Sequence, residues 1–248
     1  MEGLQNLEQL NKQIISPVSH YAENLIKIHK RNILSIAIYG SAVGEDFIFG
    51  VSDINMAVIL DKLGFEDLKK SLLIVSRGLK YKISAPLFLT KDYVIASTDV
   101  FPIEFFQIKE NNIVIFGEDI FGPLRIDGEN LRLFCEQQIK GKLVRVRQAY
   151  LEIGLRQAGI KHILKDSLKQ LFPVFRNILR LKNIEPPLTN NDIVEQLCKE
   201  FGLDKNLFDI ISKDKRKDFI GIKLIDLQVY LEKFLMQLER LSLIVDNL

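Results

Sequence analysis

The apolar positions of the first half follow helical and strand spacings in turn. From residue 4 to 30 they recur at intervals of three and four, which predicts an amphipathic helix that Pro17 kinks or splits. Short apolar runs predict strands, and longer periodic segments predict helices. Strands are expected at 33–39, 55–60, 87–90, 103–108 and 112–116, and further helices at 65–80 and 91–97. This half is therefore of the α/β (α+β) class.

After Gly122 and Pro123 the apolar spacing becomes helical throughout. Helices are expected at 131–164, 168–181, 192–201 and 220–245. Thr189 begins a polar stretch that can cap the helix at 192–201, and the charged run 213–218 predicts a solvated loop. We therefore expect an all-helical second half and place the boundary near residue 125, which gives domains at 1–125 and 126–248.

The last predicted helix carries a stripe of leucines at helical spacing. Such a stripe usually packs into the core of its own domain. If the stripe is exposed instead, it would suit a homodimer.

Composition narrows the class of protein. The chain has 248 residues, of which 47% are hydrophobic, so it can bury one large core or two modest ones. The formal net charge of +2 is too small to indicate a nucleic-acid or membrane partner by itself. The uncharged apolar stretch at 33–44 is roughly half of the ~20 residues that a membrane-spanning helix needs. We expect a soluble protein.

The cysteines and the N-terminus predict the compartment. Cys135 and Cys198 lie far apart and lack the spacing of a metal site, so buried thiols in a reducing environment are expected. Residues 1–10 contain acids where a signal peptide would need a basic segment and an apolar run. These features predict a cytoplasmic protein.

A candidate site begins where the first predicted strand ends, at Gly40 and Ser41. Glycine lets a ligand approach the backbone closely, and the serine hydroxyl can donate a hydrogen bond to a phosphate. Ser52 precedes the next strand. Asp53 and Asn55 are two residues apart there, so their side chains leave the same face of the strand. The pattern favours binding of a phosphate and a metal ion.

The residue pair 40–41, the loop 42–51 and the tetrapeptide 52–55 together resemble the motif of DNA polymerase β-like nucleotidyltransferases. The order of a sheet half and then a helical half is similar to the minimal and aminoglycoside-type members of that superfamily. The resemblance implies a mixed-sheet nucleotidyltransferase domain followed by an all-helical C-terminal domain. It also implies Mg²⁺-dependent transfer of a nucleoside monophosphate from a nucleoside triphosphate, such as ATP, to a hydroxyl acceptor.

The resemblance implies carboxylate ligands at 53 and 55 and a third from a neighbouring strand. Position 55 departs from this pattern, since it holds Asn55. A carboxylate about 4 Å from a divalent ion gains roughly twice the ~4 kcal/mol of a pair of unit charges at an effective dielectric constant of about 20, before desolvation. An amide keeps only its dipole. Glu104, flanked by apolar residues on the expected strand 103–108, is the best candidate for the third ligand, and Asp99 is the alternative.

Two functions therefore remain open. In the first, a magnesium-dependent nucleotidyltransferase uses Asp53 and Glu104 as catalytic carboxylates. The remaining assignments are Gly40, Ser41 and Ser52 as triphosphate contacts and Asp53, Asn55 and Glu104 as metal ligands. In the second, which Asn55 favours, the chain is a catalytically inactive nucleotide-binding or protein-interaction module that keeps the fold.

Basic residues are concentrated at the beginning of the helical half, at Arg132, Lys140, Lys142, Arg145 and Arg147. They could face a triphosphate or an anionic acceptor, or they could form a solvated helical surface. The histidines, His20, His29 and His162, lack the spacing of a zinc site. The sequence does not identify the acceptor.

Overall fold

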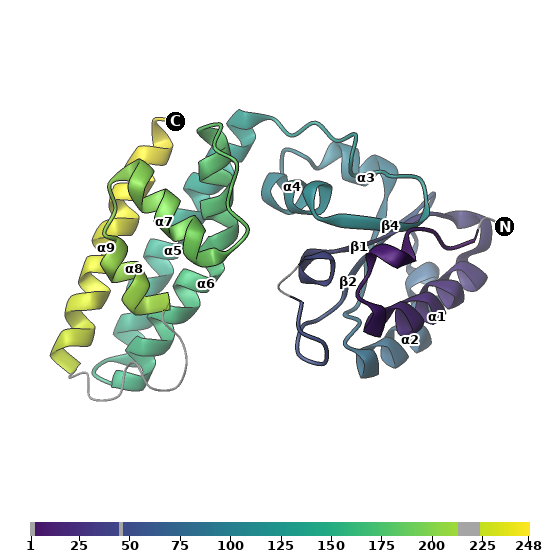
Figure 1. Cartoon of the computed structure of the whole chain (residues 1–248), viewed down its shortest axis with the longest axis horizontal. Coiled ribbons are helices and arrows are strands. Elements are labelled where there is room, and N and C mark those ends of the chain that lie inside the picture. The colour runs from purple at the N-terminus through teal and green to yellow at the C-terminus, as the bar shows by residue number, and fades with distance from the viewer. Residues whose placement is uncertain (1–2, 45–46, 213–223) are drawn as a thin grey trace. The chain divides into compact units, whose positions relative to one another are not determined.

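The computed structural model describes residues 3–44, 47–212 and 224–248. The chain divides into two compact units, Met1–Ile126 and Asp127–Leu248. The first unit contains the sheet and the second contains only helices in its described part. Figure 1 shows the elements of each unit. The predicted sheet domain followed by an all-helical domain is thus confirmed.

The sheet of the first unit is mixed. Its strands are β1 (Ile33–Tyr39), β2 (Asn55–Leu60), β3 (Leu87–Thr90) and β4 (Asn112–Gly117). Their order is β3-β2-β1-β4. The apolar strand β1 pairs antiparallel with β2 on one side and with β4 on the other, while β3 pairs parallel with β2. The strands predicted for these four segments are confirmed.

Helices cover both faces of this sheet. One face packs against α1 (Lys12–His29) and α2 (Phe65–Gly78), and the other against α3 (Lys91–Ala96) and α4 (Pro102–Glu110). Successive strand residues point to opposite faces, so Ile36 packs beneath α1 whereas Ala37 packs beneath α4. Pro17 lies inside α1, which runs on through it. Short 3-10 helices lie at Leu7–Gln9, Lys30–Asn32, Gly40–Val43 and Leu79–Tyr81.

The strand expected at 103–108 is wrong, because this segment forms α4. Pro102 occupies the first turn, where its missing N–H is not needed and its fixed φ suits a helix. Pro102, Phe105 and Ile108 are buried and three residues apart, which is a helical spacing. In a run this short, alternating and helical spacings are hard to tell apart.

The helical unit contains α5 (Gly128–Ile153), α6 (Gln157–Leu181), α7 (Asn190–Phe201), α8 (Lys205–Ser212) and α9 (Leu224–Asp246). The expected helix 131–164 is wrong in one respect, since it is broken at Gly154, which has φ +63°. The expected break after residue 164 is also wrong, because α6 continues through it. The cap at Thr189 is confirmed, since its side chain accepts a hydrogen bond from the Asp192 N–H. The charged run 213–218 and the expected helix start at 220 lie outside the described residues.

Buried thiols are confirmed, since Cys135 and Cys198 are both free and buried. Burial raises the pKa of each thiol to about 12. In the described part of the chain, every helix is too short or too polar to cross a membrane.

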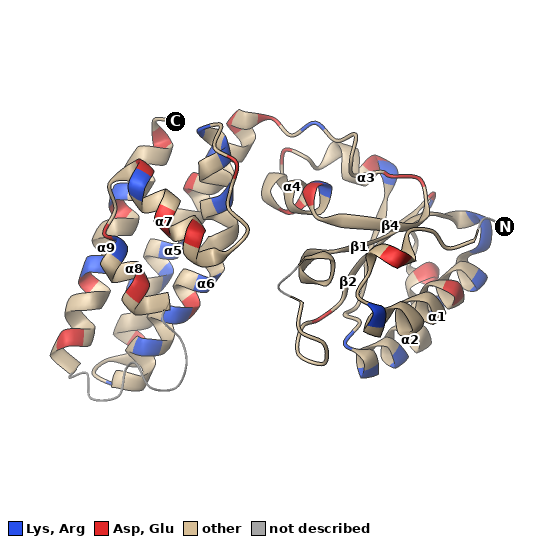
Figure 2. Ribbon diagram, in the orientation of Figure 1, with Lys and Arg blue, Asp and Glu red and all other residues tan. Residues whose placement is uncertain are grey.

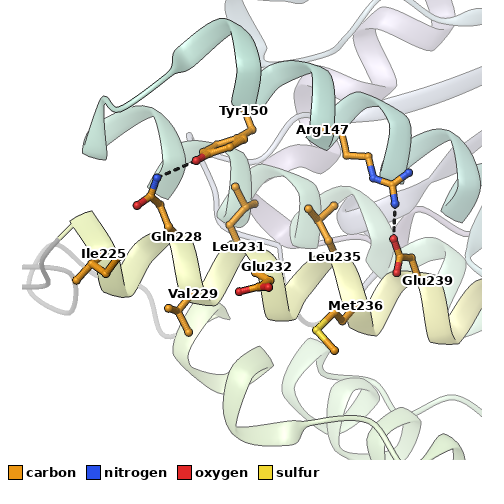
Figure 3. Close-up of a pocket in the computed structure, with 10 residues that line it drawn as sticks. All are labelled: Arg147, Tyr150, Ile225, Gln228, Val229, Leu231, Glu232, Leu235, Met236 and Glu239. Carbon is orange, nitrogen blue, oxygen red and sulfur yellow. Dashed lines mark hydrogen bonds and ion pairs between the residues drawn. The ribbon is translucent and has the colours of Figure 1, made fainter.

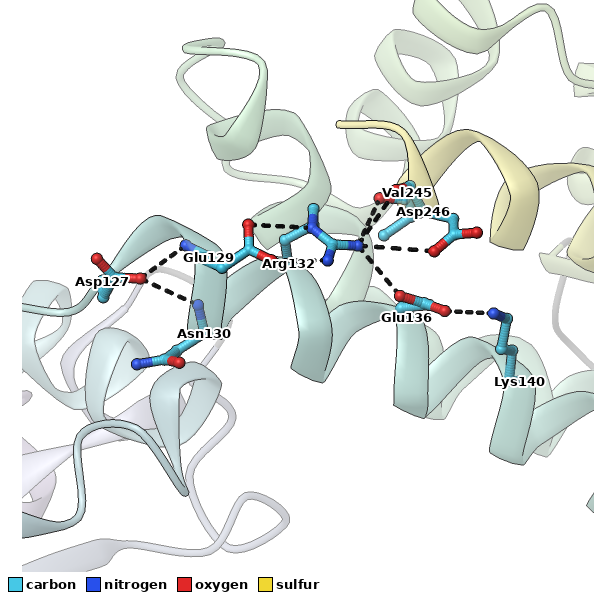
Figure 4. A network of polar contacts seen from close by, with 8 residues as sticks. All are labelled: Asp127, Glu129, Asn130, Arg132, Glu136, Lys140, Val245 and Asp246. Atoms are coloured by element: carbon cyan, nitrogen blue, oxygen red, sulfur yellow. Dashed lines mark hydrogen bonds and ion pairs between the residues drawn. The ribbon is translucent and has the colours of Figure 1, made fainter.

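The basic residues of α5 contact other residues of the helical unit. Arg132 pairs with Glu129 and Glu136. Its guanidinium also donates to the backbone carbonyls of Val245 and Asp246 at the end of α9 and lies near the Asp246 carboxylate (Figure 4). Lys140 pairs with Glu136 as well, and these two cations lower the pKa of the Glu136 carboxyl. Figure 2 shows charges of both signs interspersed along the helices of this unit.

Two further cations of α5 also have partners within the unit. The Lys142 ammonium is bonded to the Gln170 side chain at 2.5 Å, and Arg147 pairs with Glu239. Four of the five basic residues singled out in the sequence are therefore bound to neighbouring helical residues.

A buried histidine joins α1 to α2. His29 Nε2 lies 2.9 Å from Ser71 Oγ, and its Nδ1 lies 3.9 Å from a carboxylate oxygen of Asp67. Burial lowers the pKa of His29, Asp67 raises it, and Lys70 lowers it. Burial has the largest effect, so the folded chain favours the neutral imidazole more than the unfolded chain does.

This pKa shift predicts a pH dependence of stability. Below the ordinary pKa of 6.5 the unfolded chain takes up the His29 proton more readily than the folded chain. The contribution of His29 to the free energy of unfolding is therefore fully present well above pH 6.5, and it is lost as the pH falls through and below 6.5. We expect the free energy of unfolding in urea to fall more in the wild type than in His29→Gln between about pH 7.5 and about pH 5.5. Equal pH slopes in the two proteins would contradict this role of His29.

Candidate functional site

The candidate site lies at the edge of the sheet where β1 ends and β2 begins. Tyr39, the last residue of β1, pairs with Asn55 on β2 and with Asn112 on β4. The next residue, Gly40, has φ +76° and donates its backbone N–H to the Asn111 carbonyl at 3.3 Å. The ends of three strands thus meet at the turn that begins with Gly40.

Gly40 and Asn55 are in close contact. A Cβ atom added to Gly40 would lie 3.2 Å from Asn55 Nδ2. That distance is tighter than most Cβ contacts, and the positive φ of Gly40 disfavours any other residue. The structure therefore brings the turn and the strand of the predicted motif together.

The loop before β2 is closed by a turn. The Ser52 hydroxyl accepts a hydrogen bond from the Ile48 N–H at 3.0 Å, and the Ser52 N–H donates to the Ile48 carbonyl at 2.8 Å. Gly50 lies in this turn with φ +76°. Ser52 therefore has a structural contact, and its predicted contact with a triphosphate stays a prediction.

Polar side chains at this edge have no partner in the described part of the chain. The Ser41 hydroxyl, the Asp53 carboxylate and the Asn55 amide make no side-chain hydrogen bond or ion pair with any described residue. Ser41 and Asp53 are exposed, and Asn55 is half-buried. Burial raises the pKa of the adjacent Tyr39. The site thus offers a hydroxyl, a carboxylate and an amide to a ligand.

Glu104 does not stand on a strand beside β2. It is exposed in the first turn of α4, whereas the opposite end of that helix leads to Asn111, the partner of Gly40. Residues 104 and 111 are about 10 Å apart along a helix axis at 1.5 Å per residue. Asp99 lies in the turn between α3 and α4. The strand that supported Glu104 as a ligand is absent, and its role as a ligand stays a prediction.

The segments that flank the start of β2 carry no carboxylate. On one side are the last residues of β1 and Gly40, and on the other is the segment 82–84, where Ile83 forms a bridge with Ile54. Throughout the described residues, no three His, Cys, Asp or Glu side chains are grouped so that they could hold a metal ion. The oxygens of Asp53 and Asn55 are nevertheless the hard donors that Mg²⁺ prefers.

The sequence pattern did not point to Glu110, the last residue of α4. It immediately precedes Asn111, whose carbonyl accepts the Gly40 N–H. Reading 102–110 as a helix would have turned attention to this end of the segment.

Comparison with solved structures supports the fold. A spectinomycin adenyltransferase from Enterococcus faecialis, solved with ATP and spectinomycin, is similar with a TM-score of 0.51 and 11% sequence identity. The match covers 88% of this chain and 98% of that one. No family model and no curated protein sequence matches the chain. The likeness shows that the chain shares the fold of that adenyltransferase.

The contact between Gly40 and Asn55 predicts different costs for two alanine substitutions. Gly40 and Gly50 have the same φ of +76°, but a Cβ at Gly50 would meet nothing within 4 Å. We expect each of Gly40→Ala and Gly50→Ala to lose about 1 kcal/mol for the dihedral angle. Gly40→Ala should lose more, because it must also displace the amide of Asn55. Urea denaturation measures the difference, and equal losses would show that the contact is unimportant.

Proposed function

We propose that the first unit binds a nucleoside triphosphate together with Mg²⁺ and transfers a nucleoside monophosphate to a hydroxyl acceptor. The observation that carries the proposal is the contact of Gly40 with Asn55, beside the uncommitted side chains of Ser41 and Asp53. The nucleotidyltransferase fold of the chain supports the same reading.

Each residue of the turn has a role in this proposal. Gly40 lets the phosphates approach the backbone, because it presents no side chain on that surface. Its own N–H is bonded to Asn111, so it does not serve as a phosphate donor. Ser41 supplies that donor through its exposed hydroxyl.

Asp53 and Asn55 are the residues that would hold the ion. Magnesium commonly uses one or two carboxylates together with the oxygens of substrate phosphates, and this pair offers a carboxylate and an amide oxygen. The ion would polarise the phosphate oxygens and stabilise the negative charge of the leaving pyrophosphate. Asp53 lies two residues before Asn55, the first residue of β2, and in an extended segment that spacing would direct both side chains to the same side. The chain would thus contribute position and charge.

The similar adenyltransferase suggests how the substrates should be chosen. Since it was solved with ATP and spectinomycin, ATP is the first donor to examine and spectinomycin the first acceptor. Attack by an acceptor hydroxyl on the α-phosphorus would form a new ester bond and break the bond to the pyrophosphate. The hydroxyl proton would leave to solvent or to a nearby base.

Replacing Asp53 tests whether the proposed ion site exists. Asp53→Asn keeps the shape of the side chain and removes its charge. We expect it to weaken magnesium-dependent ATP binding by about 10- to 100-fold, which corresponds to roughly 1.4 to 2.8 kcal/mol. Calorimetry with ATP in the presence and absence of magnesium measures the effect. Unchanged binding would remove Asp53 from the site.

Asn55→Asp makes the opposite change at the neighbouring position. It adds a charge where the amide now offers only a dipole, so magnesium affinity should rise by about 10-fold or more if residue 55 faces the ion. Unchanged affinity, with the fold intact, would show that residue 55 does not face it.

Glu104 and Glu110 lie at opposite ends of α4, so they form a matched pair of variants. The position of Glu104 leads us to expect a smaller loss of metal-dependent binding for Glu104→Gln than for Asp53→Asn. Glu110→Gln serves as the comparison at the end that leads to Asn111. A loss for Glu104→Gln as large as that for Asp53→Asn would restore Glu104 as the third ligand.

Release of pyrophosphate separates transfer from simple binding. The wild-type protein with ATP, magnesium and a panel of hydroxyl acceptors should release pyrophosphate with at least one of them, and Asp53→Asn should abolish the release. Tight ATP binding without release for any acceptor would support the catalytically inactive module instead.

A further inference from the structure

The exposed apolar residues of the helical unit are concentrated on α5 and α9. In the described part of the chain, α6, α7 and α8 expose no large hydrophobic residue, whereas those exposed on α5 and α9 have between 40% and 79% of their surface accessible. On α9 these residues are Ile225, Val229, Met236 and Leu243, and on α5 they are Leu133, Val144 and Leu151. Two neighbouring helices thus each carry exposed apolar residues.

Within α9 the exposed residues follow a heptad. Val229, Met236 and Leu243 are seven residues apart, and Glu232 and Glu239 occupy the intervening positions at steps of three and four. The core residues Leu231 and Leu238 lie on the other side of the helix. An apolar residue every seven positions supplies one of the two heptad positions by which helices pack on one another, and acids occupy the other here.

A groove of about 460 Å³ runs between α5 and α9. Figure 3 shows Leu231 and Leu235 extending toward α5, while Glu232 lies between Val229 and Met236. Glu232 is exposed and has no charged partner among the residues that the structure describes. The apolar seam of α9 therefore contains an unpaired carboxylate.

The two helices run antiparallel. Near one end of the pair Arg132 lies close to Asp246, and near the other end the Tyr150 hydroxyl accepts a hydrogen bond from Gln228. These contacts are the same number of residues apart on both helices, so they define one register between α5 and α9.

The register gives the levels of the charged residues along the groove. This register places Glu232 within one residue of the level of Arg147. The ion pair of Arg147 with Glu239 is offset from the register by eight residues, so it joins side chains of different levels. By the same register, Glu239 stands near the level of Lys140. Acids of α9 and cations of α5 therefore lie at matching levels.

We propose that the α5/α9 face pairs with the same face of a second copy of this chain, forming an antiparallel four-helix bundle across a two-fold axis parallel to the helices. Rotation about that axis preserves heights and places α9 opposite α5 of the second copy. All neighbouring helices are then antiparallel, as in up-down bundles. Glu232 faces Arg147 of the second copy. Glu232 and Glu239 of α9 thus lie opposite Arg147 and Lys140 of α5 in the second copy.

The area of the face agrees with this occupant. A helix of 23 residues is about 34 Å long, and two helices about 10 Å apart present a face roughly 20 Å wide. That gives about 700 Å² per partner, close to the ~800 Å² per partner of a stable interface. An isologous contact also closes on itself and leaves no free face.

The mass of the full chain in solution tests the proposal. Sedimentation equilibrium from about 1 to about 100 μM should give twice the 28.5 kDa of one chain. The double variant Val229→Glu/Met236→Glu should raise the dissociation constant by about 100-fold, because it places charges in the centre of the interface. Both residues are exposed, so the melting curve should keep its cooperativity.

A matched control uses another exposed apolar face. Phe65 and Leu72 are also seven residues apart on α2 and are 71% and 65% exposed. Phe65→Glu/Leu72→Glu adds the same charges and should leave the dimer unchanged. Glu232→Lys should weaken the dimer by about 10-fold, since it would face Arg147 of the second copy.

Three results would overturn the proposal. They are a monomer at every concentration, a dimer that survives Val229→Glu/Met236→Glu, and equal loss of the dimer in the α2 control. The test does not depend on ATP or magnesium, so it is independent of the proposed function.

Discussion

The register of β1 with its two neighbours determines where the polar groups of the candidate site lie. Tyr39 pairs with both Asn55 and Asn112, and this alignment brings Gly40 against the Asn55 amide. Strand side chains alternate between faces, so a slip of one residue would turn Asn55 toward α1 and bring Ile54 to the site. Both faces of β2 are buried, so packing opposes that slip: it would exchange the small Ala57 with Met56 or Val58 between two differently shaped cores.

Much of this arrangement can be predicted from the sequence. The apolar runs of the strands indicate their bounds. The shared face expected for Asp53 and Asn55 stays a prediction, since β2 begins only at Asn55. The segment 103–108 could not be assigned from spacing alone, since Pro102 starts a helix that is only nine residues long. Glu104 was chosen as a candidate ligand because the segment was predicted to be a strand beside β2. Since the segment is a helix, the predicted position of Glu104 on a strand is wrong for the same reason. A third ligand depends on tertiary position, which local patterns do not encode.

In the helical unit the sequence predicted the helices better than the breaks between them. Gly154 ends α5 with a positive φ, whereas the polar residues near 165 remain within α6. Spacing alone does not distinguish a polar helical turn from a connection. It also left two readings open for the basic residues and for the leucine stripe of α9. Arg132 pairs with Glu129 within α5, and Arg147 pairs with Glu239 of α9, so both cations bind acids of their own unit. Most of the leucine stripe, including Leu227, Leu231, Leu238 and Leu241, is buried in the core.

A site with one carboxylate and one amide has a particular thermodynamic consequence. Its own attraction for a divalent ion is small, so under the proposed function most of the negative charge around the ion comes from the nucleotide. Coupling between two ligands is reciprocal, and the factor by which the nucleotide raises magnesium affinity equals the factor by which magnesium raises nucleotide affinity. Neither ligand alone should therefore bind strongly. Under the proposed function, Asn55 would make the site respond to the complex of ion and triphosphate, because the amide withholds the charge that would let the ion bind by itself.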